Sequence, residues 1–253
     1  MKSQSIFYRW YKMEAKRVAV VTGAYGFLGR RICVLLAKDK YILVALGRDK
    51  RKLEELIASI KEHSCESMYF ICDVRKQEQV AGVVNDIMGA FGRIDVLINA
   101  AGIGNVAEFK NTNISDVRNT FMTNYFGTVF LIKSVLPHMI AKQSGKIINV
   151  SSLGGKLALP GLSAYSASKF AINGFSESIY YELKKRNISV SLICPGRFYA
   201  TKAPITDLTG ISVDKVAKTI IRSVTEKKFE HILPRRAILL LAKRLILGLR
   251  NYR

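Results

Sequence analysis

The chain has 253 residues, 49% of them hydrophobic, which allows one sizeable folded domain and excludes a disordered or fibrous protein. Forty Lys and Arg against 19 Asp and Glu give a formal net charge of +21. This charge favours anionic partners such as nucleic acid, anionic lipid, an acidic protein or a phosphorylated cofactor, and it equally fits a solvated basic surface. The four cysteines form no CxxC pair, which fits a reducing compartment, and no metal site is expected.

Residues 1–16 precede the first predicted strand and mix aromatic with basic side chains. They contain no apolar core of signal-peptide length, and Met13 is an alternative start. We treat them as an N-terminal extension to a domain spanning 17–233. Near the C-terminus, Lys243 and Arg244 break an apolar run far shorter than the roughly 20 residues that span a bilayer. We therefore expect a cytoplasmic protein without a transmembrane helix.

Short apolar runs alternate with stretches of helical periodicity along most of the chain. Because the runs are almost continuously apolar, helices are expected to cover both faces of a parallel sheet. The predicted fold class is therefore α/β, a single-domain Rossmann-type doubly wound parallel sheet. Strands are predicted at 18–21, 41–46, 68–72, a run ending at Asn99, 146–150 and 188–193, and helices at 27–38, 49–63 with Asp49 as N-cap, 78–91, about 115–142 and 164–186.

Polar or glycine-rich segments follow each of these strands. Ligands of doubly wound sheets bind beyond the carboxyl ends of the strands, so these segments predict one ligand site. The glycine loop TGAYGFLG at 22–29 alone fits either a phosphate-binding turn or an ordinary tight corner. The other segments are Gly47-Arg48, Asp73-Val74, Asn99 to Gly102, Ser151-Ser152 and Pro195-Gly196.

Tyr165 and Lys169 stand four residues apart in a predicted helix and project from one face, about one turn apart. Alone, this YxxxK pattern is common and also fits a surface tyrosine packed on a lysine stem. Here it occurs with Ser152 thirteen residues upstream of Tyr165, with NAAG at 99–102 and with the glycine loop. In this combination and order, the chain resembles the short-chain dehydrogenase/reductase family from about residue 17 to residue 201.

The resemblance implies an oxidoreductase and assigns catalytic roles to matching residues. Tyr165 would donate or accept the proton, and the ammonium of Lys169 would lower the tyrosine's pKa and bind the nicotinamide ribose. Ser152 would hold the substrate oxygen. Asn124, in MTNYFGT, matches an asparagine that anchors a water relay to the lysine, although a core asparagine at a helix kink is the alternative.

The resemblance also implies that the glycine loop binds a diphosphate at a helix N-terminus. The segment after strand three would flank the adenine, NAAG would lie beneath the adenosine half, and the segment after strand six would close over the carboxamide. Its expected cofactor contacts are Gly23, Tyr25, Gly26, Phe27, Leu28, Gly29, Arg48, Asp73, Val74, Asn99, Ala100, Ala101, Gly102, Tyr165, Lys169, Pro195, Gly196 and Thr201.

The end of the second strand bears on the choice of cofactor. An acidic residue there would bind the 2′-hydroxyl of NAD, but Gly47 occupies that place and Arg48, suited to a 2′-phosphate, follows. Against this, Asp49 comes next, and Gly26 stands where a second basic residue often lies in the loop. We predict NADP(H) in preference to NAD(H).

The glycine loop departs from the pattern of the family's shorter branch, TGxxxGxG, because Gly26 is the middle glycine and Phe27 takes the usual glycine position. TGxxGxxG is typical of the extended branch of sugar-nucleotide enzymes. The chain has too few residues after Pro195 for the substrate domain of that branch. We therefore assign the chain to the shorter branch, with a local variant of the loop.

Apolar side chains dominate the two segments where this family selects its substrate. They predict an apolar wall suited to a hydrophobic ketone, aldehyde or secondary alcohol, of the lipid, steroid or retinoid type. Some of them could instead pack the loops. The residues concerned are Leu153, Leu157, Leu159, Leu162, Phe198 and Tyr199.

The C-terminal tail, 234–253, departs from the family's common ending of a final strand and a glycine-rich terminus. On a helix, its arginines and Lys243 would share one sector, opposite a stripe of leucines. Such a basic amphipathic helix could anchor the protein to an anionic membrane surface, cover the substrate site or pack in a dimer. Arg235, Arg236, Lys243, Arg250 and Arg253 form the basic sector, and Leu241, Leu245 and Leu249 the apolar stripe.

Two further functions compete with the leading one. A 3-oxoacyl reductase acting on an acyl-carrier protein would use the basic surface to receive an acidic carrier. A nucleotide-binding regulator without catalysis would be expected to have lost Tyr165 or Lys169, yet both are present. Nucleic acid is not an expected partner, and a homodimer or homotetramer is expected.

Overall fold

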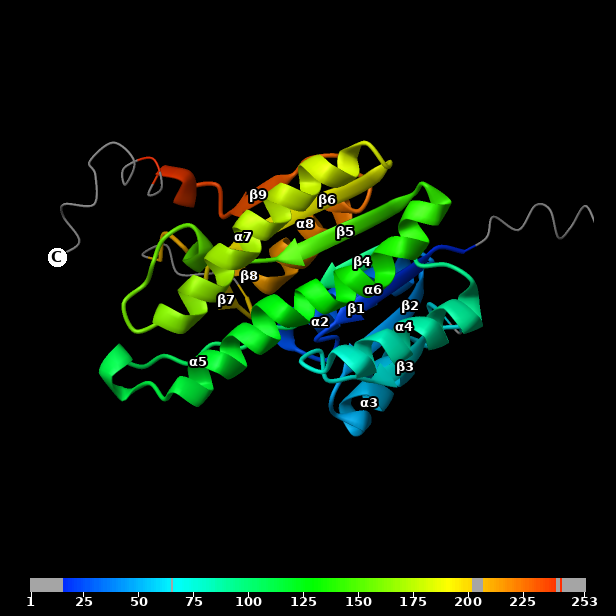
Figure 1. The fold of residues 1–253 in the computed structure, drawn as a ribbon, viewed down its shortest axis with the longest axis horizontal. Helices are drawn as coiled ribbons and strands as arrows, with labels where there is room; N and C mark the ends of the chain where they lie inside the picture. Colours follow the sequence, from blue (N-terminus) through cyan, green and yellow to red (C-terminus); the bar gives the residue numbers. More distant parts are fainter. Residues whose placement is uncertain (1–15, 65, 202–206, 240–241, 243–253) are drawn as a thin grey trace, which may run out of the picture.

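A computed structural model describes residues 16–64, 66–201, 207–239 and 242 of the chain. Its centre is a seven-stranded sheet in the order β3-β2-β1-β4-β5-β6-β9, in which all neighbours run parallel (Figure 1). The strand order reverses between β1 and β4, where a crevice is expected. The strands are β1 Val18–Thr22, β2 Ile42–Gly47, β3 Met68–Ile71, β4 Val96–Asn99, β5 Gly145–Val150, β6 Ile188–Pro195 and β9 Glu230–Leu233.

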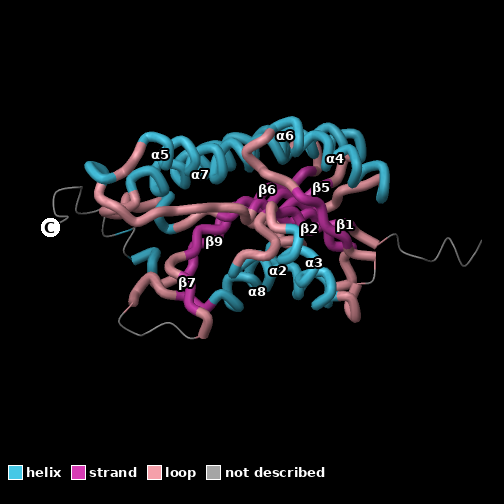
Figure 2. Tube along the Cα trace, turned by 90° about the horizontal axis from the view of Figure 1, so that it is seen from below, coloured by secondary structure: helices cyan, strands magenta, loops and turns pink. Residues whose placement is uncertain are grey.

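Helices cover both faces of the sheet, as the continuously apolar strands predict. Figure 2 shows α4, α5, α6 and α7 above the sheet and α2, α3 and α8 below it. The bounds are α2 Phe27–Lys38, α3 Lys50–Ile60, α4 Gln77–Phe91, α5 Ile114–Phe121, α6 Gly127–Lys142, α7 Ser163–Lys184 and α8 Val213–Ser223. A small second sheet pairs β7 Phe198–Tyr199 with β8 Ile211–Ser212. The predicted doubly wound architecture is confirmed.

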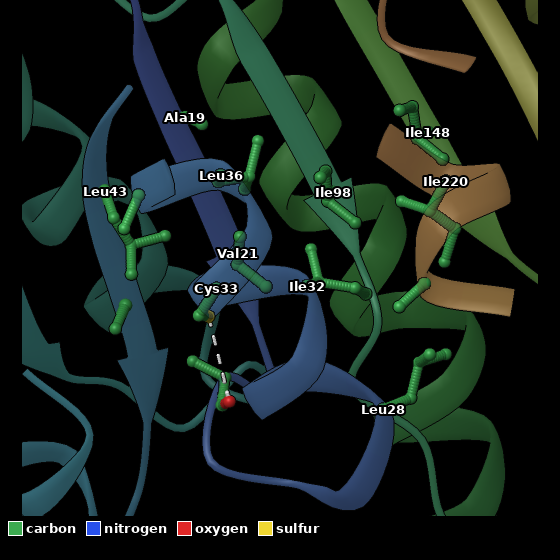
Figure 3. Close-up of a cluster of buried hydrophobic side chains, with 14 of the residues drawn as sticks. Ala19, Val21, Leu28, Ile32, Cys33, Leu36, Leu43, Ile98, Ile148 and Ile220 are labelled. Carbon is green, nitrogen blue, oxygen red and sulfur yellow. Dashed lines mark hydrogen bonds between the residues drawn. The ribbon is translucent and has the colours of Figure 1, made fainter. Parts of the chain in front are cut away.

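The apolar core lies in two layers, one on each side of the sheet. In the layer beneath β1, Ile32 and Leu36 of α2 pack on Ala19 and Val21 with no exposed surface (Figure 3). Burial of each such Ile or Leu contributes about 1.5–3 kcal/mol. This packing fixes the start of α2, and therefore the glycine loop, relative to the sheet.

Local sequence signals explain several helix ends. Asp49 caps α3 as predicted, because its carboxylate accepts a hydrogen bond from the backbone nitrogen of Lys52 at 3.1 Å. Gly92, with φ +65°, ends α4 in the left-handed conformation common at helix C-termini.

Two features differ from the sequence-based expectation. The long helix predicted at 115–142 is interrupted by a π-helical turn, Met122–Phe126, which contains Asn124. The expectation that the chain lacks a final strand is wrong, because Glu230–Leu233 forms β9 and pairs with β6. This strand is defined by its pairing with the distant β6, which no local sequence pattern contains. Of the tail 234–253, residues 240–241 and 243–253 lie outside the described residues, as does the extension before Lys16. Within the described chain, no helix is both long and apolar enough to cross a membrane.

Candidate active site

A cleft of about 760 Å³ opens at the carboxyl ends of the central strands. It collects most of the predicted cofactor and catalytic residues, although they come from segments far apart in the sequence. Asn99 and Asn124 are buried and do not line the cleft, and Thr201 is exposed and lies outside it. The predicted residues that do line it are Gly23, Tyr25, Gly26, Phe27, Leu28, Gly29, Arg48, Asp73, Val74, Ala100, Ala101, Gly102, Ser152, Tyr165, Lys169, Pro195 and Gly196.

The glycine loop forms a tight turn that brings backbone amides to the cleft. Gly23 has φ +63°, and a β-carbon there would lie 2.9 Å from Cα of Ala101, so only glycine fits. Gly26 is the N-cap of α2, and no side chain of the described chain caps this helix. Amide donors at the start of α2 are therefore available to an anion, which the helix dipole also favours.

At one end of the cleft, Tyr25 covers the end of β2. Its ring lies where a β-carbon on residue 47 would stand, so Gly47 makes room for it. The phenol oxygen accepts a long hydrogen bond, 3.4 Å, from the backbone nitrogen of Arg48, and Nζ of Lys52 lies 5.6 Å from the ring centre. The Asp49 carboxylate lies 3.4 Å from Lys52 Nζ. One cation, Lys52, thus lies over the Tyr25 ring, while the acid beside it is engaged in capping α3.

Asp73 follows β3 at the same end of the cleft. Nε and Nη2 of Arg75 donate to its carboxylate at 2.9 and 2.6 Å. These hydrogen bonds hold the pKa of Asp73 below its usual range, against the opposing effect of burial. The carboxylate is therefore charged at neutral pH and oriented by Arg75.

Thr22, the first residue of the glycine loop, is buried and has a structural role that the sequence analysis did not assign to it. Its Oγ1 accepts hydrogen bonds from the backbone nitrogens of Ala100 and Ala101, both at 3.0 Å, and so joins the ends of β1 and β4. Asn99 lies deeper, where its amide donates to Oδ1 of Asn149 at 2.9 Å. Its buried Oδ1 has no partner among the described residues. The structure thus places Asn99 as support for the cleft floor rather than as a cleft-lining residue.

Ser152, Tyr165 and Lys169 converge at the other end of the cleft. Ser152 follows β5, and its Oγ accepts a hydrogen bond from the backbone nitrogen of Gly154 at 3.0 Å and contacts the Tyr165 hydroxyl. Lys169, one turn beyond Tyr165 on α7, places Nζ 5.7 Å from the ring centre and donates to the Val150 carbonyl at 2.9 Å.

The pKa values of Tyr165 and Lys169 differ from the expectation that the lysine lowers the pKa of the tyrosine. Burial raises the pKa of Tyr165 above its ordinary value, and the hydrogen bond with Ser152 offsets part of that effect. Burial also lowers the pKa of Lys169 to about 8. The lysine is almost completely buried and is therefore a weaker source of positive charge than a free ammonium, so it does not depress the tyrosine's pKa here.

Asn124 joins the π-helical turn to the strand-four loop. Its Oδ1 accepts from the backbone nitrogen of Ile103 at 2.8 Å, and its Nδ2 donates to the Ile103 carbonyl at 2.9 Å and to Oγ of Ser168 at 3.0 Å. Gly102 lies between Asn124 and Lys169, since a β-carbon there would be 3.5 Å from both side chains. Both side-chain ends of Asn124 are thus engaged with protein groups.

The remaining wall of the cleft is mainly apolar. Of the predicted substrate residues, Tyr199 does not line it and instead donates from its hydroxyl to Asp207 at 2.9 Å. Ile103 and Val106 line it although the sequence did not single them out, as do Arg197 and Thr209. Ile103 and Val106 directly follow NAAG in the sequence, and this position could have identified them as residues of the cleft. The predicted residues that line the wall are Leu153, Leu157, Leu159, Leu162 and Phe198.

Comparisons with known proteins agree with this geometry. A family model described as short chain dehydrogenase matches residues 17–207. Dehydrogenase/reductase SDR family member 7B of Danio rerio is 31% identical over 238 residues, covering 86% of this chain and 77% of that protein. A 3-ketodihydrosphingosine reductase of Bacteroides thetaiotaomicron is 34% identical over 211 residues, covering 82% and 74%.

Solved structures give the same picture. A metagenomic short-chain oxidoreductase in complex with NADP aligns with a TM-score of 0.77 at 30% identity, covering 86% of this chain and 95% of that one. A short chain dehydrogenase/reductase from Burkholderia phymatum in complex with NAD aligns with a TM-score of 0.84 at 22% identity, covering 91% and 93%. At 22% identity, the similarity to the Burkholderia phymatum structure supports the fold only. The fold therefore occurs with either cofactor.

Proposed function

The chain belongs to the short-chain dehydrogenase family of oxidoreductases, and from this premise we propose that it transfers hydride between NADP(H) and a hydrophobic ketone, aldehyde or secondary alcohol. The observation that carries the proposal is the meeting of Ser152, Tyr165 and Lys169 in one cleft with the uncapped start of α2. A cofactor-binding regulator would not need a buried phenol beside a lysine.

A nicotinamide dinucleotide fits the residues of the cleft. The left-handed Gly23 and the amides at the start of α2 would hold its diphosphate. Arg48 lines the cleft and favours a 2′-phosphate, because Gly47 leaves no carboxylate at the end of β2. Lys52 adds a second cation at the Tyr25 ring. In the sequence, Asp49 counted against NADP because an acid there could bind the ribose of NAD. In the structure its carboxylate caps α3. These contacts support NADP(H) over NAD(H).

When bound, the nicotinamide supplies or accepts the hydride. In the reducing direction, Oη of Tyr165 donates a proton to the carbonyl oxygen, and Oγ of Ser152 holds that oxygen by a hydrogen bond. Lys169, one turn along α7 from Tyr165, would bind the nicotinamide ribose. Because burial raises the pKa of Tyr165, the phenol keeps its proton at neutral pH, the form that reduction requires.

The apolar wall supports a lipophilic substrate. Leu153, Leu157 and Phe198 line the cleft near the reacting residues, and Val106 and Leu159 continue the apolar surface to exposed positions. A long substrate could thus extend from the reaction centre to the opening of the cleft. The relative from Bacteroides thetaiotaomicron is by its name a reductase of 3-ketodihydrosphingosine, which agrees with a lipid ketone.

An exposed aromatic face supports assembly into a homodimer or homotetramer. Phe170 and Tyr181 of α7 are 42% and 64% exposed, and eleven residues apart they share one side of the helix. A second copy of the chain would bury them. Light scattering measures the mass in solution, and a monomer at micromolar concentration would contradict this assembly.

Association with an anionic membrane through the tail is a further part of the proposal, supported by the net charge of +21 and the basic sector of the tail. Flotation with anionic liposomes tests it in the full chain and in a chain ending at residue 239. Equal binding of the two would contradict the role of the tail.

Consumption of NADPH with a panel of carbonyl compounds tests the proposed activity. We expect turnover of long-chain hydrophobic ketones or aldehydes, weaker turnover of short polar ones and a lower kcat/KM with NADH. Faster turnover of 3-oxoacyl thioesters carried on acyl-carrier protein would favour the carrier-linked reductase. Tight NADPH binding without turnover of any carbonyl would favour the regulator.

A further inference from the structure

Between β6 and α8 the structure describes residues 196–201 and 207–212, and these two parts contribute to one wall of the cleft; we call them the wall segment. Phe198 and Thr209 of this segment line the cleft. Its described ends are joined by the β7–β8 pairing, in which the backbone nitrogen of Ile211 donates to the Arg197 carbonyl at 2.9 Å. The Thr209 carbonyl lies where a β-carbon on residue 196 would stand. Gly196 therefore allows the backbone at Thr209 to pack directly against the backbone at residue 196.

Arg236, which follows β9, holds the wall segment from outside the cleft. Its Nε donates to the Leu208 carbonyl at 3.1 Å, and its Nη2 donates to the carbonyls of Asp207 and Gly210 at 2.7 and 3.1 Å. One guanidinium thus binds three carbonyls of a single turn. Its planar, rigid set of donors can do this, whereas the ammonium of a lysine presents a different geometry.

The side chain of Asp207 continues this connection to the cleft. Its Oδ1 accepts from the backbone nitrogen and from Oγ1 of Thr209, at 2.9 and 2.8 Å. Its Oδ2 accepts from the hydroxyl of Tyr199 in β7, at 2.9 Å. The turn held by Arg236 is therefore bonded to Thr209, which lines the cleft, and to the neighbour of Phe198, which also lines it.

The main chain around Arg236 is itself fixed. Ala237 has no exposed surface, and its backbone nitrogen donates to the Pro234 carbonyl at 2.9 Å. The carbonyl of Leu233 accepts from the backbone nitrogen of Gly196 at 2.7 Å. The segment that follows β9 is thus anchored to the sheet at one side and contacts both ends of the wall segment.

We propose that Arg236 is a positioning residue that sets the wall formed by Phe198 and Thr209 and, through it, the affinity of the cleft for its ligands. The sequence places Arg235 and Arg236 together on the basic sector of the tail, and the structure separates them. Arg235 is exposed, and its side chain makes no polar contact with the described chain. It is therefore a matched control of the same charge. The expected effect on substrate affinity rests on the proposed function. The expected effects on NADPH affinity and on amide hydrogen exchange do not.

The test compares R236A, R236K and R235A in the full chain. Hydrogen exchange of the amides from Thr209 to Ile211 should become about tenfold faster in R236A, because the turn loses three hydrogen bonds. The Kd for NADPH or the KM for a hydrophobic ketone should rise about tenfold while kcat changes less than about twofold. R236K should shift in the same direction, and R235A should match the wild type. Guanidinium ion at low concentration should partly restore R236A, whereas ammonium at the same ionic strength should not.

Three outcomes would overturn the proposal. In the first, R236A and R235A have the same rates of amide hydrogen exchange and the same Kd for NADPH and KM for the ketone. In the second, R236A exchanges faster with unchanged Kd and KM, which would make Arg236 a structural contact only. In the third, R236A lowers kcat and leaves the Kd for NADPH and the KM for the ketone unchanged. If R236A fails to fold, R236K carries the same comparison. If the wild type reduces no carbonyl, the proposed function fails, and NADPH affinity together with amide exchange still decides the role of Arg236.

Discussion

Gly104 lies against the ring of Tyr165 so closely that a β-carbon at position 104 would stand 2.8 Å from Cδ2 of the ring. Gly154 approaches from the Cε1 side, where a β-carbon would be 3.2 Å away. The phenol is therefore held between two backbone segments that carry no side chains, and its hydroxyl meets Ser152.

Adding a methyl group at Gly104 should displace the Tyr165 ring. We expect G104A to lower kcat at least about tenfold, because small misplacements of a reacting group are costly. The Kd for NADPH should change much less. G89A is the control, because a β-carbon on this α4 glycine meets nothing within 4 Å and should stabilise the helix by about 0.5–1 kcal/mol. Wild-type kcat in G104A would show that the ring tolerates displacement.

Arg48 should determine the preference for the phosphorylated cofactor. In R48A the Kd for NADPH should rise about tenfold or more, while the Kd for NADH stays nearly constant, because only the 2′-phosphate loses its cation. Arg51 offers a matched control on the outer face of α3, where it lies 3.9 Å from Glu55. Fluorescence titration with both cofactors measures the effect. An equal loss for NADPH and NADH in R48A would mean that Arg48 does not recognise the 2′-phosphate.

The exposed end of the apolar wall should govern chain length. Val106 lines the cleft and is 77% exposed, so V106D would place a charge where a long substrate leaves the cleft. We expect the KM for a long-chain ketone to rise about tenfold or more and the KM for a short ketone to stay nearly constant, since only the long chain reaches this position. Equal effects on both substrates would contradict this path for the substrate chain.

Lys146, remote from the cleft, should make stability depend on pH. It is 5% exposed, and its Nζ donates to the hydroxyls of Ser189 and Ser191 and to the Glu226 carbonyl. Burial lowers its pKa from 10.5 to about 8, so between these values the unfolded chain holds a proton that the folded chain does not. The contribution of Lys146 to the free energy of unfolding therefore rises with pH across this window and is constant below it.

The measurement is urea unfolding of wild type and K146M at about pH 7.5 and about pH 9.5. The free energy of unfolding of the wild type relative to K146M should increase by up to about 1.4 kcal/mol per pH unit. K133M, at an exposed position of α6, should show no such change. A difference between wild type and K146M that does not vary with pH would contradict a lowered pKa at Lys146.

Much of the fold could be predicted because apolar periodicity reports local burial. The predicted helix at 27–38 and the predicted N-cap Asp49 agree with the structure. The final strand could not be predicted, since the pairing of Glu230–Leu233 with β6 depends on a distant neighbour. The π-helical turn around Asn124 likewise reflects contacts with Ile103 and Ser168 that no local pattern contains.

The candidate site divides in the same way. Ser152, Tyr165 and Lys169 were predicted because their spacing, together with NAAG and the glycine loop, resembles a known family, and the structure brings the three into one cleft. Residues that act through long-range hydrogen bonds were not found. Thr22 contacts backbone nitrogens 78 and 79 positions away, and Arg236 contacts a turn 26 to 29 positions away. The titration of Lys169 was also missed, because its burial follows from tertiary packing.

The most direct test of the central claim is the rate of NADPH consumption with a saturating hydrophobic ketone in wild type and in Y165F, with NADPH affinity measured in parallel. The variant removes only the hydroxyl that meets Ser152. We predict that kcat falls at least about a hundredfold, the range expected for loss of a general acid, while the Kd for NADPH stays within about twofold. Undiminished turnover in Y165F would contradict the assignment of the proton donor and, with it, the proposed mechanism.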